Sequence, residues 1–318
     1  MSEYLAIQAF GPALSHTINA FWPLRIGQIF RLLLISFFIG AWITGPVPQD
    51  FTFADIPYVS QFSIGDSMSG QIGLIISVMA GILFILLLYA LFSSIFQFIF
   101  VDYLSAGDRI LPSFLARTGM GIRLLGFYLA TILLIGLCAV AAIIGIAIPV
   151  LLSNPDNPTI FFIALLYTLA GLLVLILPVW ILTIITTDFV VPVMMVHNCG
   201  VLRGWKIIFK EFSGKWDEAG MYLLIKIGIN IITGVVLGLF LVLAMESLGI
   251  SSLTLIPGMP AAPDYSLVYL ILPLILVAGI TLIVMTPVVT FLRYYALIFL
   301  ELLSDTYALL PEIHRNQR

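Results

Sequence analysis

Long stretches without a single charged residue dominate this sequence. Five of them are long enough, or nearly so, to cross a bilayer, which takes about 20 apolar residues; they are 67–101, 124–155, 157–187, 227–245 and 265–292. Charged residues make up only 9% of the chain and hydrophobic residues 62%, whereas soluble domains carry roughly 25% charged residues. Because such a chain cannot cover itself with polar side chains, we expect it to fold in lipid.

These runs predict an all-α integral membrane protein with six transmembrane helices. The shorter uncharged run 32–49 supplies the first helix, together with apolar residues around Arg31. The expected spans are 26–45, 71–99, 123–152, 160–187, 220–245 and 266–292. We expect one transmembrane domain over 1–318, in which an interfacial segment (1–25) precedes the six-helix core (26–292) and a cytoplasmic helix and tail (293–318) packs on the cytoplasmic elements.

Positive charge is confined to one side of these spans. All 13 Lys and Arg residues lie in the N-terminal segment, in the second and fourth connections, in the C-terminal tail or at the adjoining helix ends. The other three connections carry acidic residues and no Lys or Arg. Since Lys and Arg stay on the cytoplasmic side, we expect a multi-pass protein of the cell membrane with both termini in the cytoplasm.

Short motifs recur along the chain and suggest a repeat. The sequences "FRLL" (30–33), "IRLL" (122–125) and "MYLL" (221–224) begin three of the helices. Two returning helices share "LILP", and each has a second proline 14 residues later, at Pro192 and Pro287. These matches suggest three copies of one helical hairpin, which stays a hypothesis because leucine-rich runs match easily by chance.

The segment 201–216 has the pattern of an amphipathic helix. Apolar side chains recur at helical spacing, at Leu202, Trp205, Ile208, Phe209, Phe212 and Trp216. Cations occupy the other side, at Arg203, Lys206 and Lys210, with Lys215 near the end. A helix of this kind lies in the membrane interface with its cations toward anionic headgroups. We therefore expect these four cations to contact lipid headgroups.

The residues just before this helix leave a sharper alternative open. Asp188, His197 and Cys199 could hold a metal ion, or Cys199 and His197 could form a nucleophile and base. A zinc site needs three or four ligands, however, and the chain has only three His and two Cys residues. We favour an interfacial turn and expect no catalytic residue, no metal and no cofactor.

Three stretches carry a family resemblance: "FWPLRIGQIFRLLLISFF", "FQFIFVDYLSAGDRILPSFLARTGMGIRLL" and "DFVVPVMMVHNCGVLRGWK". They resemble archaeal multi-pass membrane proteins of unassigned function and, more distantly, the membrane domain attached to some glycerophosphodiester phosphodiesterases. The resemblance covers nearly the whole chain and implies six spans in a prokaryotic cell membrane. The hydrolase domain of those enzymes has no counterpart in this sequence, so the resemblance implies no enzymatic activity.

The favoured function is that of a non-enzymatic membrane scaffold, accessory subunit or lipid-interacting protein. Gly234 and Gly238 have the spacing that lets helices approach closely, and Asn230 can form a hydrogen bond between helices. We expect these residues to pack helices, within the chain, in a homo-oligomer or against a partner membrane protein. The expected partners are membrane lipids, anionic ones included, and not nucleic acid.

Two other classes stay open. The middle thirds of the expected spans hold no ionisable residue, which disfavours an ion-driven pump but allows an uncharged-pore channel or a transporter of a hydrophobic or neutral substrate. A lipid-modifying enzyme would need reactive groups at one membrane face, where the candidates are Asp102, Asp188 and His197.

Overall fold

The computed structural model describes residues 4–23, 25–40, 68–106, 110–148, 158–247 and 266–307. Every regular element within these ranges is helical, and the all-α membrane architecture is confirmed. In chain order, the N-terminal half contains α1 (Leu5–Phe21), α2 (Ile26–Ile39), α3 (Met68–Ala106), α4 (Ile110–Ala142), the π-helix η2 (Ile143–Ala147) and α6 (Pro158–Ile185). The remainder contains the π-helix η3 (Thr186–Val190), α7 (Val191–His197), α8 (Val201–Glu211), α9 (Trp216–Ser247), α11 (Ser266–Leu303) and the 3-10 helix η4 (Asp305–Tyr307).

Five helical stretches of the described chain are long and apolar enough to cross a membrane: Ile76–Ser105, Phe114–Gly145, Leu177–His197, Trp216–Leu243 and Ile275–Leu303. The first expected span differs. Helix α2 has 14 residues and ends at Gly40, whose φ of 92° is left-handed; at 1.5 Å per residue it is only about 21 Å long. Among the described residues it passes as a sixth span only when α1, from which it is bent by 119°, is counted with it. The rest of the expected span, 41–45, lies outside the described residues.

The chain divides by its internal contacts into two compact units. Unit 1 comprises Met1–Phe96 and Gly214–Leu303, and unit 2 comprises Gln97–Ser213 and Ser304–Arg318. Helix α3 runs through the boundary, so that its first part belongs to unit 1 and its last turns to unit 2. The expected single domain stays a prediction.

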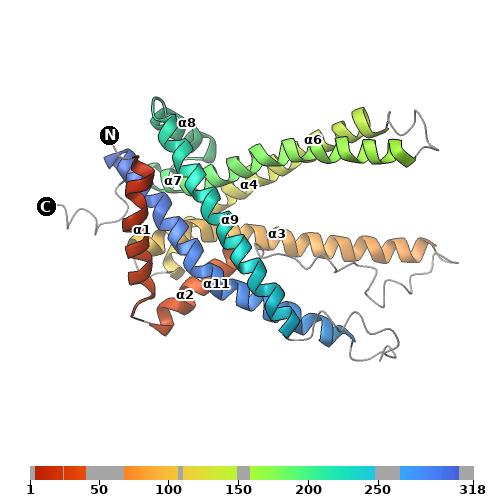
Figure 1. The fold of residues 1–318 in the computed structure, drawn as a ribbon, viewed down its shortest axis with the longest axis horizontal. Helices are drawn as coiled ribbons and strands as arrows, with labels where there is room; N and C mark the ends of the chain where they lie inside the picture. Colours follow the sequence, from red (N-terminus) through yellow and green to blue (C-terminus); the bar gives the residue numbers. More distant parts are fainter. Residues whose placement is uncertain are drawn as a thin grey trace. The chain divides into compact units, whose positions relative to one another are not determined.

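Unit 1 is built on the carboxyl-terminal part of α11. Every residue from Thr290 to Glu301 is buried, and a helix buried on all sides needs neighbours on all sides. Helix α1 packs against it (Figure 1), and α2 and α9 also contact α11. Helix α11 runs past 292, the expected end of the last span, to Leu303.

Aromatic rings fill the space between α9 and α11. Tyr222 of α9 stacks on Tyr295 with ring centroids 4.9 Å apart and contacts Phe299 at 4.8 Å. All three side chains are completely buried. Further along the pair, Leu237, Leu241 and Met285 form a second buried cluster. Helices α9 and α11 are therefore packed against each other over much of their length.

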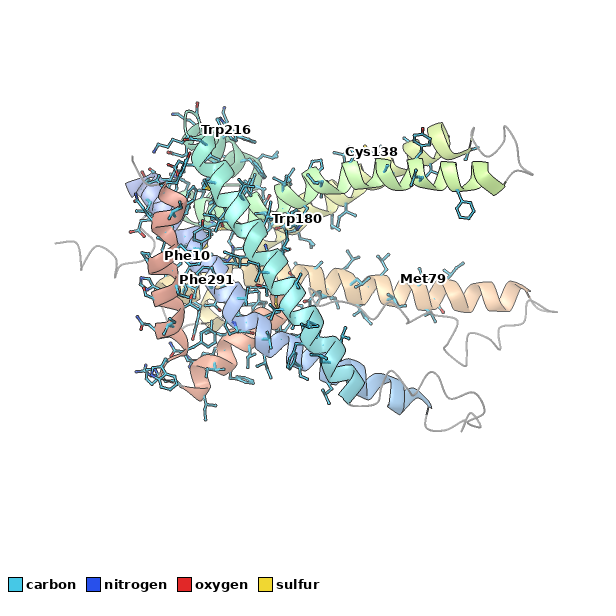
Figure 2. All side chains as sticks on the ribbon, in the orientation of Figure 1. Phe10, Met79, Cys138, Trp180, Trp216 and Phe291 are labelled. Carbon is cyan, nitrogen blue, oxygen red and sulfur yellow. The ribbon has the colours of Figure 1, made fainter. Side chains whose placement is uncertain are left out.

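Helix α1 presents alanines to α11. Ala6, Ala9 and Ala13 are all 0% exposed, and side chains this small let two helix backbones approach closely. Beside them, the Phe10 ring meets the Phe291 ring edge-on at 5.3 Å, and Figure 2 shows these two side chains between α1 and α11. The Tyr295 hydroxyl donates a hydrogen bond of 3.0 Å to the Ala6 carbonyl. The interface is thus close-packed and also contains a buried polar contact.

The first turn of α9 caps two other helices. The Leu5 N–H at the start of α1 donates to the Glu218 carboxylate at 2.8 Å, and the Lys215 ammonium donates to the Leu303 carbonyl at the end of α11 at 3.1 Å. An anion suits the positive end of a helix dipole and a cation the negative end. These two contacts fix where α1 begins and α11 ends relative to α9.

In unit 2, α4 and α6 pack together as a pair (Figure 1). Arg117 of α4 forms a two-pronged ion pair with Asp102 of α3, with nitrogen–oxygen distances of 2.9 and 3.0 Å. Both side chains are partly exposed, so the pair adds little stability. Its two parallel hydrogen bonds still fix the start of α4 on the end of α3.

Replacing Ala9 by Leu should destabilise unit 1. The larger side chain has no space at a position that is 0% exposed, and overpacking a filled core costs about 1–3 kcal/mol. Thermal unfolding of the purified protein in detergent micelles would measure the effect. Asn19→Leu is the control, because Asn19 is exposed on the same helix and the substitution should leave the melting temperature nearly unchanged. Equal shifts in both variants would contradict the α1–α11 packing.

Candidate membrane-lipid interface

The interface begins where α6 changes its helical geometry. Helix α6 gives way at Thr186 to the π-helix η3, and Pro192 opens α7. Proline has no N–H to donate to the carbonyl four residues earlier, which belongs to Asp188, and a π-turn is one way to accommodate this. Helix α7 then ends at Asn198, whose φ of 45° is left-handed. This reverses the chain direction before α8 begins.

Helix α8 packs closely on this elbow. Gly204 lies so near it that an added Cβ would be 2.9 Å from Val190 Cγ1 and 3.3 Å from Met194 Cγ. Ile208 is 0% exposed, and the Phe212 ring meets Phe189 edge-on at 5.3 Å. One face of α8 is therefore bound to protein and fixes the orientation of the other faces.

The apolar side of α8 is divided between a part that packs on protein and a part that is exposed. Ile208 and Phe212 are buried, but Leu202 is 78% exposed and Phe209 49% exposed. At 100° per residue, Leu202 and Phe209 form a stripe of their own beside the buried one. The sequence pattern merged the two because it cannot distinguish an apolar side chain that packs on protein from one that faces lipid.

The third face of α8 carries the cations. Arg203, Lys206 and Lys210 are all exposed, and their spacing of three and four residues places them on one side of the helix. The helix thus has three stripes: one packed on η3 and α7, one apolar and exposed, and one cationic and exposed. We call the last two together the α8 surface.

Lys215 belongs to a different unit from these three cations and has a partner of its own. It belongs to unit 1, whereas α8 belongs to unit 2, and its ammonium donates to the Leu303 carbonyl. Its identity as a headgroup ligand stays a prediction, and the α8 surface is defined by Leu202, Arg203, Lys206, Phe209 and Lys210.

Asp188, His197 and Cys199 are the residues that could have formed a metal site or a nucleophile and base. They lie close together in the sequence but have different surroundings. Asp188 is buried in η3 at 4% exposure. The His197 ring, at the end of α7, meets the buried Tyr307 ring at 5.9 Å. Among the residues that the structure describes, no three His, Cys, Asp or Glu side chains form a group that could hold a metal ion.

Cys199 connects this turn to the cationic stripe electrostatically. Burial raises the pKa of the Cys199 thiol, and the positive charge of Arg203 partly offsets the rise. Burial also raises the pKa of Tyr307, and the negative charge of Glu211 adds to the rise. Both shifts keep the groups neutral, which suits a packed turn better than an activated thiolate.

The three helix-packing candidates lie on α9. Gly234 is exposed, and a Cβ there would meet nothing within 4 Å among the described residues. Gly238 and Asn230 are half-buried. Their role in packing against a second chain stays a prediction.

Sequence reasoning did not predict that four ionisable residues are buried. Asp188, Lys226, Arg293 and Glu301 are each between 4% and 7% exposed, and none is without a partner. Burying a charge is costly unless it is paired. The available signal was a lone charge inside a long apolar run, as at Lys226 and Arg293.

Replacing Gly204 by Ala should loosen α8. The added methyl group must displace Val190 or Met194, and overpacking costs about 1–3 kcal/mol, more than the roughly 1 kcal/mol that alanine gains over glycine in a helix. We expect a lower melting temperature in detergent. Gly220→Ala in α9 is the control, since a Cβ there meets nothing within 4 Å, and it should not lower stability. A Gly204→Ala protein as stable as the control would contradict the close approach.

Comparison with known proteins gives one match. A family described as a family of unknown function (DUF7544) matches residues 4–310. No curated protein matches the chain, and no solved structure does.

Proposed function

Because the chain belongs to a family of unknown function, DUF7544, we propose a function from its own residues. The protein is a lipid-interacting scaffold or accessory subunit of the cell membrane, and not an enzyme. Its α8 surface binds the headgroups of anionic lipids. We also propose that the protein is archaeal and that it is distantly similar to the membrane domain of glycerophosphodiester phosphodiesterases.

The division of α8 into three stripes supports this proposal most directly. One stripe is fixed on η3 and α7 by Gly204 and Ile208. The exposed apolar stripe then suits the acyl-chain side of the interface, and the exposed cationic stripe suits the headgroups. A helix with these faces binds membranes through apolar burial together with attraction to anionic lipids.

The three cations of α8 should make its surface prefer anionic to neutral lipids. A basic residue near an anionic membrane surface contributes about 1 kcal/mol, so Arg203, Lys206 and Lys210 together favour anionic over neutral lipid by roughly 3 kcal/mol. Attraction between exposed charges is screened over about 8 Å at physiological salt. The preference for anionic lipid should therefore weaken as salt increases.

The proposed orientation places the α8 surface on the cytoplasmic leaflet. It rests on the distribution of the 13 Lys and Arg residues, which lie on one side of the expected spans, and on the tendency of such residues to stay in the cytoplasm. Both termini then face the cytoplasm. The anionic lipids of that leaflet give the surface its partners.

Transport of a neutral or hydrophobic substrate is the second candidate. The polar residues Thr281, Thr286 and Thr290 are buried along α11, as they would be beside a path through the membrane. The hydroxyl of Thr286 donates to Leu282 O, however, and that of Thr290 to Thr286 O. These two hydroxyls already have acceptors within their own helix, so their burial does not indicate a path for a substrate. We therefore favour lipid interaction over transport.

Replacing Arg203, Lys206 and Lys210 together by Gln should reduce retention of anionic lipid. The change removes three positive charges and keeps polar side chains of similar length. We expect native mass spectrometry at low salt to show fewer bound anionic lipids than for the unchanged protein, and the difference should shrink as salt increases during purification.

A second triple variant, Arg25→Gln, Arg123→Gln and Arg318→Gln, removes the same charge from positions outside α8. It should retain most of the anionic lipid. If both variants lose lipid equally, retention follows net charge and the α8 surface is no site. If neither loses lipid, the cations of α8 only orient the protein.

A further inference from the structure

Helix α1 has a three-sided surface like that of α8, but without charge. Its first stripe, Ala6, Ala9, Ala13 and Thr17, is buried. No Asp, Glu, Lys or Arg occurs between Leu5 and Phe21. Whatever the exposed sides of α1 contact therefore cannot be selected by charge attraction.

The second stripe of α1 is apolar and exposed. Its members are spaced three and four residues apart and are 39–54% exposed: Ile7, Phe10, Leu14 and Ile18. Trp22, just beyond the helix, is 69% exposed. Bulky aliphatic and aromatic side chains aligned in this way form a continuous apolar strip along the helix.

The third stripe is polar. Gln8, Ser15 and Asn19 are exposed, and their spacing of seven and four residues places them together on one side. The Ser15 hydroxyl donates to the Pro12 carbonyl of the same helix. The side-chain amides of Gln8 and Asn19, however, would lie among acyl chains if the helix crossed the bilayer, where polar groups are unfavourable. A helix lying in the interface turns them toward water.

The rotation of α1 about its own axis is fixed by unit 1. Its N-terminus is held by Glu218 and its middle by the contact of Phe10 with Phe291. Further along, the His16 ring stacks on Tyr294 at 5.5 Å. These contacts join α1 to α9 and α11, which both contain candidate spans, so its apolar strip keeps one direction relative to them.

We propose that α1 lies in the lipid–water boundary of the membrane that α9 and α11 cross, and that the expected first span, 26–45, crosses this membrane without α1. Its apolar strip inserts between lipids, and its Gln, Ser and Asn side chains face water. The partner is the lipid surface itself, bound through apolar contact and not through charge. The depth of insertion follows how loosely the lipids pack, because a helix of this kind must find space between headgroups.

This inference is independent of the α8 proposal, since it concerns unit 1 and predicts no dependence on charge. The two helices then anchor the protein in different ways. The α8 surface responds to anionic lipid and to salt, whereas α1 responds to the packing of the lipids and to neither of those.

Two adjacent positions on α1 provide the test. Leu14→Cys and Ser15→Cys would each be made with Cys138→Ser, which leaves the buried Cys199 as the remaining native cysteine. After labelling with an environment-sensitive fluorophore, the full chain is reconstituted into phosphatidylcholine vesicles with brominated acyl chains. We expect bromine to quench the label at 14 severalfold more than the label at 15.

Quenching at 14 should not change with salt or with added phosphatidylglycerol. It should weaken when saturated chains replace unsaturated ones in the carrier lipid. The pair Ile18→Cys and Asn19→Cys gives a second comparison should a variant at 14 or 15 fail to fold.

Each of three results would overturn the inference. Equal quenching at both positions of a pair would mean that lipid surrounds α1, as in a spanning helix. No quenching at the apolar position would mean that protein covers the strip, for example a second copy of the chain. Quenching that rises with phosphatidylglycerol or falls with salt would mean that charge controls the contact.

Discussion

The burial of α11 between Thr290 and Glu301 is the packing on which unit 1 depends. A helix buried on every side acquires its position from its neighbours, and here α1, α2 and α9 supply them. The closest contact uses alanines that are 0% exposed. Lipid gives helices little hydrophobic reason to associate, so close packing and hydrogen bonds such as that from Tyr295 to Ala6 must hold them together.

The same requirement explains why α9 begins with charged residues that are already engaged. Glu218 and Lys215 contact the positive end of one helix and the negative end of another. Each such contact contributes about 0.3–1 kcal/mol at an exposed site and more where it is partly buried. Two opposite charges three residues apart thus fix helices that lie at opposite ends of the sequence.

Helices α1 and α8 are arranged in the same way but are built from different residues. In each, one stripe packs on the unit that contains the helix, and the two other stripes are left for the surroundings. Glycine permits the close approach of α8 at Gly204, and alanine that of α1 at Ala9. The stripes then diverge, because α8 carries Arg203, Lys206 and Lys210 whereas α1 carries only uncharged polar residues. The proposed functions of the two helices rest on this difference.

Composition and periodicity were enough to predict five of the six expected spans and the existence of α8, because helices that cross lipid must be long and apolar, and local sequence shows this. They were not enough to distinguish Ile208, which packs on protein, from Phe209, which is exposed, since that depends on where η3 and α7 lie. The alanine stripe of α1 gives no strong hydropathy signal. The contact of Leu5 with Glu218 joins residues 213 apart, and no local pattern predicts it.

The most direct test of the account is which side of the membrane each connection faces. Single cysteines would be introduced in the Cys138→Ser protein by Ser60→Cys, Asn157→Cys, Ser252→Cys or Ser213→Cys, the last at an exposed position beside α8. A membrane-impermeant thiol reagent applied to intact cells should label the first three, which lie in connections without Lys or Arg. It should label Ser213→Cys only after the cells are made permeable. Labelling of Ser213→Cys in intact cells would contradict the proposed orientation and would move the α8 surface to the outer leaflet.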